Sequence, residues 1–133
     1  MSAVFWITGL SDTGKTTLGN CLNQELKQKY KKTVFLDGDT LRKDIFSLEN
    51  NLNSHDRSSR LSLAKKYINL CKLLYEQGFI VIISTISLFK EVHSINRNIF
   101  KNYCEIFLDI DLNTLKKRDS KGLYKKFEDG KIK

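Results

Sequence analysis

One segment near the amino terminus combines residue types that could hold a chain of phosphates. Gly9, Gly14, Lys15 and Thr16 fit the spacing G-x-x-x-x-G-K-[ST] without a mismatch, between an apolar stretch and an amphipathic one. Glycines let successive backbone N–H groups curl around a phosphate, and the start of a following helix adds a favourable dipole. The motif therefore predicts a nucleoside triphosphate site, rather than a glycine turn that only joins a strand to a helix. Lys15 is expected to reach the β and γ phosphates, and the Thr16 hydroxyl to hold Mg²⁺.

A second group of chemically capable residues, Asp37, Asp39 and Arg42, follows the next apolar run. In a parallel sheet this position lies beside the nucleotide, at the carboxyl ends of the strands. A carboxylate there can accept a proton from an attacking hydroxyl or orient Mg²⁺, and an arginine can clamp a second, anionic substrate. The alternative is that the two aspartates only cap the helix that follows.

Positioning these residues requires alternating strands and helices. Apolar runs at 3–8, 33–36, 79–84 and 106–110 predict four strands. Helical spacing predicts helices over 15–29, over 61–78 with Gly78 at the end, and over 89–103, and a short helix over 112–119. The polar segment 47–59 is expected to be a loop. Strands buried on both faces that alternate with helices favour an α/β fold. We expect a P-loop three-layer sandwich with a parallel sheet of about four to five strands flanked by helices.

Composition narrows the class of protein further. The chain has 133 residues, which fits a single domain over 1–133, with 41% hydrophobic and 29% charged residues. Its net charge of +8 comes mostly from lysines, which we interpret as solvated helix faces rather than a nucleic-acid patch. The longest apolar run, 79–83, is too short to span a bilayer, and we expect no signal peptide before the first strand. Three widely spaced cysteines fit reduced thiols, and we expect a cytoplasmic protein.

Three segments together resemble the adenylylsulfate kinases. They are residues 5–11, 36–39 and 118–126, and the last contains Lys121-Gly122-Leu123-Tyr124-Lys125. An Asn-Lys-x-Asp motif typical of GTPases is absent, which also favours a small kinase. In that family ATP phosphorylates the ribose 3′-hydroxyl of adenylyl sulfate. The resemblance therefore implies an ATP-dependent kinase with Mg²⁺ as cofactor and a nucleotide-linked small molecule as acceptor.

The resemblance also assigns roles by position. Lys15, Asp37 and Asp39 would be catalytic, and residues 118–133 would form a lid that closes over both substrates. The positions expected to bind the nucleotide are Gly9, Ser11, Asp12, Thr13, Gly14, Lys15, Thr16, Thr17 and Arg118. Those expected to bind the acceptor are Asp39, Arg42, Arg60, Ile86, Ser87, Arg97, Lys121, Gly122, Leu123 and Lys125. Arg60 is preferred to Arg57 as the match to the family's Asp-Arg pair.

Several departures from the family pattern fall on the acceptor side. Leu63, Lys65 and Lys66 stand where the family has Asn, Arg and Arg, and Leu88 and Ser120 replace two prolines. An altered acceptor site beside an intact donor site suggests a changed acceptor. One alternative is a cytidine diphosphate-linked phosphoramidate, the substrate attributed to relatives in capsule pathways.

A second alternative, of another class, is a domain that binds nucleotide without catalysis. The family continues past the position of Lys133 with a segment that helps to hold adenine, so this sequence either is part of a longer protein or lacks that segment. Family members are often dimers, which allows a homodimer here.

Overall fold

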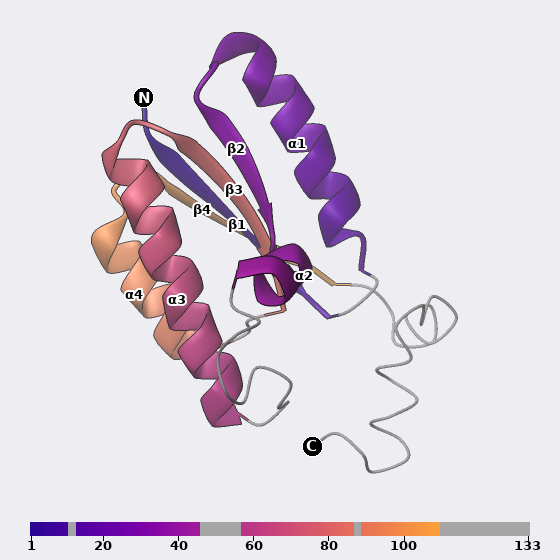
Figure 1. Ribbon diagram of the computed structural model, residues 1–133, viewed down its shortest axis with the longest axis vertical. Coiled ribbons are helices and arrows are strands. Elements are labelled where there is room, and N and C mark those ends of the chain that lie inside the picture. The colour runs from indigo at the N-terminus through magenta and orange to yellow at the C-terminus, as the bar shows by residue number, and fades with distance from the viewer. Residues whose placement is uncertain (11–12, 46–56, 87–88, 110–133) are drawn as a thin grey trace.

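The computed structural model describes residues 1–10, 13–45, 57–86 and 89–109. In these residues a parallel sheet contains four strands, β1 (Ala3–Gly9), β2 (Thr33–Asp37), β3 (Ile80–Thr85) and β4 (Tyr103–Leu108). Their order across the sheet is β2-β3-β1-β4, so β3 and β1 are central (Figure 1). Both central strands are almost entirely buried, as their unbroken apolar runs predict.

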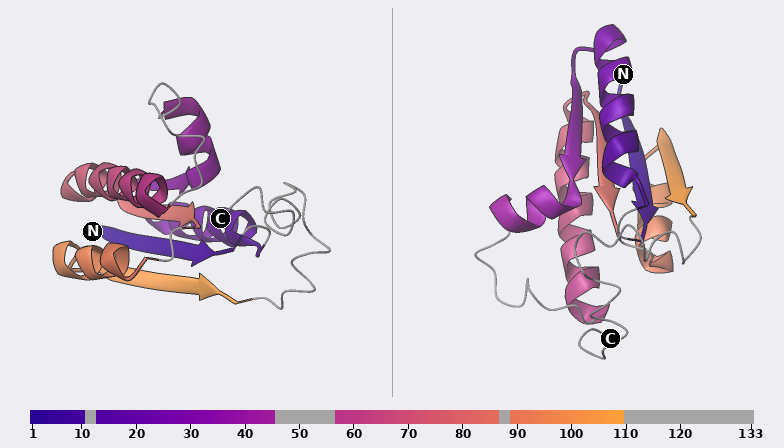
Figure 2. Two further views of the ribbon diagram at one scale, coloured as in Figure 1. Left: turned by 90° about the horizontal axis from the view of Figure 1, so that it is seen from below. Right: turned by 90° about the vertical axis from the view of Figure 1, so that its right-hand side faces the viewer.

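Helices cover both faces of this sheet. They are α1 (Lys15–Lys29), the short α2 (Gly38–Thr40), a π-helical turn η1 (Leu41–Ile45), α3 (Arg57–Glu76) and α4 (Lys90–Ile99). Two views show α1 on one face and α3 and α4 on the other (Figures 1 and 2). The predicted three-layer α/β sandwich is confirmed.

The main core lies between the sheet and the α3–α4 layer. Val4 and Trp6 of β1 and Val81 and Ile83 of β3 are fully buried there, with Cys71 of α3. Trp6 is therefore a packing residue and not a ring exposed beside the phosphate loop. None of the helices in the described ranges is both long and apolar enough to cross a membrane.

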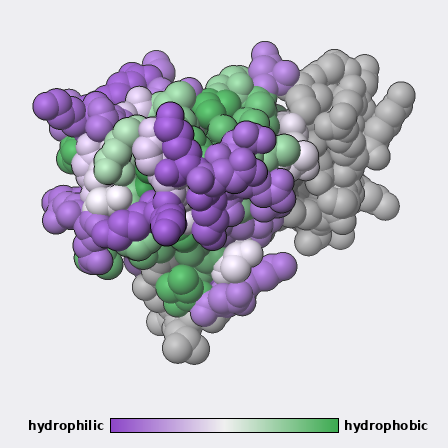
Figure 3. Space-filling model, turned by 90° about the horizontal axis from the view of Figure 1, so that it is seen from above, coloured by the Kyte–Doolittle hydropathy of each residue, from purple (hydrophilic) through white to green (hydrophobic). Residues whose placement is uncertain are grey.

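The strand register brings the candidate site together at one edge. Asp37 of β2 pairs with Ser84 of β3, and Gly9 of β1 pairs with Leu108 of β4. The phosphate loop and the acidic turn therefore both leave the sheet at its carboxyl edge. The opposite end of the molecule shows hydrophilic side chains spread between small apolar patches (Figure 3).

Three predicted boundaries were wrong. The helix predicted over 89–103 ends at Ile99, where the Phe100 N–H donates to the Asn96 carbonyl at 2.9 Å, and β4 starts at Tyr103 instead of residue 106. Strand β4 is at the end of the described strand order, its residues are half-buried or exposed rather than buried, and Glu105 precedes the apolar run that starts at Ile106. Helix α3 begins at Arg57, inside the segment predicted as a loop. The predicted helix over 112–119 lies outside the described residues.

Candidate active site

The start of α1 has the geometry of an anion site. Gly14, its N-cap residue, has φ 95° and ψ 18°, a left-handed conformation that favours glycine. Apart from its chain neighbours and the adjoining helix backbone, no atom of the described residues lies within 4 Å of the position that a Cβ on Gly14 would occupy. The Thr13 hydroxyl and the Lys15 ammonium both donate to the Leu10 carbonyl, at 2.9 and 2.7 Å. This turn thus leaves open space at the positive end of a fifteen-residue helix, where a phosphate fits.

The same turn carries a hydroxyl suited to a hard cation. Thr16 and Thr17 lie exposed in the first turn of α1, beside Lys15. A threonine hydroxyl next to bound phosphates is an oxygen ligand of the kind that Mg²⁺ prefers. The residues present therefore fit Mg²⁺ held jointly by Thr16 and a nucleotide.

The acidic turn is fixed by a small hydrogen-bond network. Asp37 Oδ1 accepts from the Asp39 backbone N–H at 3.2 Å and from Ser84 Oγ at 3.3 Å. Asp37 therefore does cap α2, as the capping alternative proposed, and its carboxylate still lies at the carboxyl edge of the sheet. Asp39 is half-buried in the single turn that follows.

Gly38 lets this turn sit directly on β3. A Cβ at Gly38 would lie 2.6 Å from the Ser84 carbonyl oxygen, so any larger residue would push the turn off the strand. On its other side, the Gly38 carbonyl accepts a hydrogen bond from the buried Tyr67 hydroxyl at 2.9 Å. The turn is thus held between β3 and α3.

The pKa of the Tyr67 phenol responds to the charged residues around the acidic turn. Burial raises the pKa of the Tyr67 phenol well above its usual range, Arg42 opposes that rise, and Asp39 and Asp37 add to it. All three charged groups must lie close to the phenol to act on it in this way. Asp37, Asp39 and Arg42 lie in the consecutive turns α2 and η1 after β2, and their roles at the site stay predictions.

Two arginines at the start of α3 have different surroundings. Arg57 forms an ion pair with Glu91 and lies over the Phe89 ring, with its guanidinium carbon 5.2 Å from the ring centroid. Its hydrogen bond lowers the pKa of the Glu91 carboxyl. Arg60 is half-buried, and its Nε has no hydrogen-bond partner among the described residues. The Arg60 Nε is thus a buried donor without a partner in the described part of the chain, whereas Arg57 is engaged within the protein.

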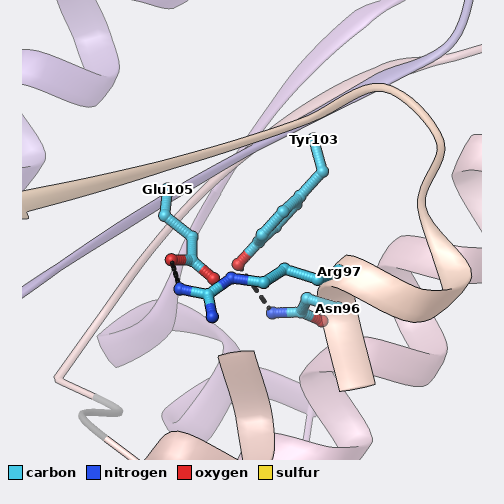
Figure 4. A network of polar contacts seen from close by, with 4 residues as sticks. All are labelled: Asn96, Arg97, Tyr103 and Glu105. Carbon is cyan, nitrogen blue, oxygen red and sulfur yellow. Dashed lines mark hydrogen bonds and ion pairs between the residues drawn. The ribbon is translucent and has the colours of Figure 1, made fainter. Parts of the chain in front are cut away.

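Arg97 is not brought to this group. Its Nη2 lies 2.6 Å from Glu105 Oε2 of β4, and in the same network Asn96 donates to the Tyr103 hydroxyl at 3.0 Å (Figure 4). Since α4 runs back from the carboxyl edge of the sheet, its last turn carries Arg97 away from Asp37 and Asp39. The structure thus corrects the expectation that Arg97 grips the acceptor.

Other predicted positions are placed only in part. Ile86 is half-buried just after β3, at the carboxyl edge. The positions that lie outside the described residues are Ser11, Asp12, Ser87, Arg118, Lys121, Gly122, Leu123 and Lys125.

Comparison with known proteins decides the family. The profile of the family described as adenylylsulphate kinase matches residues 1–133. The chain belongs to the adenylylsulphate kinase family. The resemblance seen in the sequence is thus confirmed, and the family's kinases support the predicted ATP-dependent phosphotransferase.

Relatives within this family carry two different kinase names. The chain is 43% identical over 123 residues to the cytidine diphosphoramidate kinase of Campylobacter jejuni, covering 92% of this chain and 69% of that one. It is 39% identical over 132 residues to the adenylyl-sulfate kinase of Pseudomonas aeruginosa, covering 98% of this chain and 65% of that one. The chain thus spans about two thirds of the length of these relatives.

A solved structure confirms the fold. The Mycobacterium tuberculosis APS kinase in complex with AMPPNP and APS superposes with a TM-score of 0.84 at 27% identity, over 99% of this chain and 76% of that one.

Two residues of the site were missed by sequence reasoning. Ser84 and Tyr67 contact the acidic turn from positions 47 and 29 residues away from their partners. Ser84 ends an apolar run and Tyr67 lies within the helical stripe of α3, so both resemble core residues. The only signal was the polar end of β3, Ser84-Thr85, which interrupts an otherwise aliphatic strand.

Proposed function

We propose that this protein transfers the γ-phosphoryl group of ATP to the ribose 3′-hydroxyl of a nucleotide-linked anion. The observation that carries the proposal is that the phosphate loop and the acidic turn lie at the same edge of the sheet. Strands β1 and β2, which lead into the phosphate loop and the acidic turn, are separated only by β3. Their backbones are therefore about 10 Å apart, a span that a triphosphate and an acceptor hydroxyl can bridge.

Donor binding is the task of the phosphate loop. Backbone N–H groups at the start of α1 hold the phosphates, and Lys15 offsets the charge on the group being transferred. Magnesium bound through Thr16 would neutralise charge on the β and γ phosphates. Gly9, Thr13 and Thr17 complete the nucleotide contacts proposed for the described residues.

Acceptor activation is the task of the acidic turn. The acceptor hydroxyl oxygen attacks the γ phosphorus, the bond from that phosphorus to the bridging oxygen breaks, and ADP leaves. The hydroxyl proton passes to a carboxylate of the turn, Asp37 or Asp39. Asp39 and Ile86 also contact the acceptor, whose anionic group is held by Arg42 and Arg60.

Two acceptors are candidates. Adenylyl sulfate is the substrate of the family at large. Cytidine diphosphoramidate is favoured by the 43% identical relative and by the replacement of three family positions on α3, now Leu63, Lys65 and Lys66. A change of acceptor would alter residues on the acceptor side and leave the phosphate loop of the donor side unchanged.

Initial rates of ADP release with each acceptor test the proposal and separate the candidates. Either acceptor should accelerate ADP release over ATP and Mg²⁺ alone, and Lys15→Ala should abolish the acceleration. ATP binding with no acceleration by either compound would contradict the proposal and favour the non-catalytic domain.

The proposed setting is the cytoplasm, which fits the free thiols Cys21, Cys71 and Cys104. Neither membrane nor nucleic acid is a proposed partner, and the homodimer remains a prediction.

A further inference from the structure

Tyr67 is linked to the acidic turn through a single peptide group. Its hydroxyl donates to the Gly38 carbonyl oxygen at 2.9 Å, and the N–H of that same peptide, on Asp39, donates to Asp37 Oδ1 at 3.2 Å. The hydrogen bonds therefore run in series from the phenol of α3, through the 38–39 peptide, to a carboxylate proposed to be catalytic. Ser84 donates to the same oxygen from β3.

Hydrogen bonds in series reinforce one another. A donor on the carbonyl polarises the peptide and makes its N–H a stronger donor, an effect that is larger where water is excluded. Tyr67 is buried, with only 3% of its surface exposed, and so is Gly38.

The acidic turn depends on such outside support. Helix α2 is only three residues long and continues into the π-helical turn η1, so its own backbone bonds hold it weakly. Gly38 rests against the Ser84 carbonyl on one side, and the Tyr67 hydroxyl holds its carbonyl on the other. Without that hydroxyl, the Gly38 carbonyl keeps the hydrogen bond from the Leu41 backbone N–H within the turn but loses the one that ties it to α3.

We propose that Tyr67 is a positioning residue for phosphoryl transfer, which orients the Asp37 and Asp39 carboxylates by fixing the peptide between Gly38 and Asp39. This rests on the proposed function. Tyr67 does not touch either substrate in this account, and it acts only through the turn. Its loss should therefore lower turnover while ATP binding, a property of the phosphate loop, is retained.

The test compares Tyr67→Phe with Tyr103→Phe. Each variant keeps the ring and removes one hydroxyl, and the Tyr103 hydroxyl is bound to Asn96 in the network on β4, away from the acidic turn (Figure 4). Both variants should fold, as thermal unfolding will check. For Tyr67→Phe we expect kcat to fall about 10-fold or more with KM for ATP unchanged. Tyr103→Phe should leave both constants unchanged.

A second readout does not need turnover. Amide hydrogen exchange at Asp39 should be faster in Tyr67→Phe than in wild type and unchanged in Tyr103→Phe. Equal exchange at Asp39 in wild type and Tyr67→Phe, or a Tyr67→Phe enzyme with wild-type kcat, would overturn the proposal. If wild type phosphorylates neither acceptor, the proposed function fails, and exchange at Asp39 still decides whether Tyr67 fixes the turn.

Discussion

Lys15 lies in the first turn of α1, with its Nζ 2.7 Å from the Leu10 carbonyl oxygen. Phosphoryl transfer depends mostly on positioning and charge neutralisation, so removing this ammonium should lower turnover by about 1,000-fold. Lys15→Ala should remain folded, because the side chain is not part of the core. Steady-state kinetics will measure the loss, with exposed Lys27→Ala on the same helix as the matched control. Near-normal turnover in Lys15→Ala would remove the basis of the mechanism.

Cys71 differs from the other two cysteines in exposure. It is fully buried in the core, and burial raises the pKa of its thiol to about 12, whereas Cys21 and Cys104 are exposed. Only a thiolate reacts with a disulfide reagent, so at about pH 8 two thiols should react fast and the third only on unfolding. The absorbance of the released aryl thiolate gives the count. Three fast thiols in the native protein would show that the α3 packing is wrong.

The same raised pKa has a consequence for stability. Below the ordinary thiol pKa of 9.0 the Cys71 thiol is neutral in both the folded and the unfolded state. Above that pH the unfolded chain loses this proton and the folded one does not. The free energy of unfolding should therefore fall as pH rises from 9.0 toward about 12. Denaturant melts at pH 8 and pH 10 will measure the fall, and Cys71→Ala should reduce it.

Most single residues of the candidate site could be predicted because local motifs encode them. Lys15 and Thr16 belong to a continuous phosphate motif, and Asp37 and Asp39 directly follow an apolar run. Tyr67 and Ser84 could not be predicted in this way, since only the β2–β3 pairing and the packing of α3 bring them to the turn. Arg97 was misplaced because the sequence does not show that its helix ends before β4, where Glu105 pairs with it.

At the scale of elements, the packing of α1 against β2 passes through Gly19. A Cβ there would lie 2.3 Å from the Phe35 ring, so this glycine lets the helix approach the strand. Gly19→Ala should cost about 3 kcal/mol in overpacking. Better helix propensity offsets about 1 kcal/mol of that, leaving a net loss of about 2 kcal/mol.

Chemical denaturation of Gly19→Ala alone and with Phe35→Leu will measure this contact. The smaller leucine should restore much of the loss, and the non-additivity of the pair is the signature of a direct clash. Asn20→Ala, at an exposed position of the same helix, should be nearly neutral. Additive effects of Gly19→Ala and Phe35→Leu would contradict the packing described here.

Elements with strong local signals were predicted well. The bounds of α1 agree with the prediction over 15–29, and α3 ends near Gly78, whose φ of 88° suits glycine. The start of β4 was predicted three residues too late, because only one of its sides has a neighbour among the described strands and Glu105 precedes its apolar run. The π-helical turn over Leu41–Ile45 has no sequence signature that distinguishes it from ordinary helix.

For the whole molecule, a net charge of +8 raises the question of nucleic acid. The twenty-three basic residues are mostly lysines, which we interpret as solvated helix faces rather than a groove for DNA. Binding to random duplex DNA at about 150 mM salt should therefore be weaker than about 10⁻⁵ M. Fluorescence anisotropy across a salt series checks this, and tight binding with a steep salt slope would favour a nucleic-acid partner instead.

Together, the phosphate loop and the acidic turn are proposed to form one phosphotransferase site. The most direct measurement is phosphorus NMR of the protein with ATP, Mg²⁺ and either adenylyl sulfate or cytidine diphosphoramidate. A new 3′-phosphate monoester resonance should appear on one acceptor, grow in step with ADP and be absent with Lys15→Ala. ADP and inorganic phosphate without any ester, or no change while ATP binds, would contradict it.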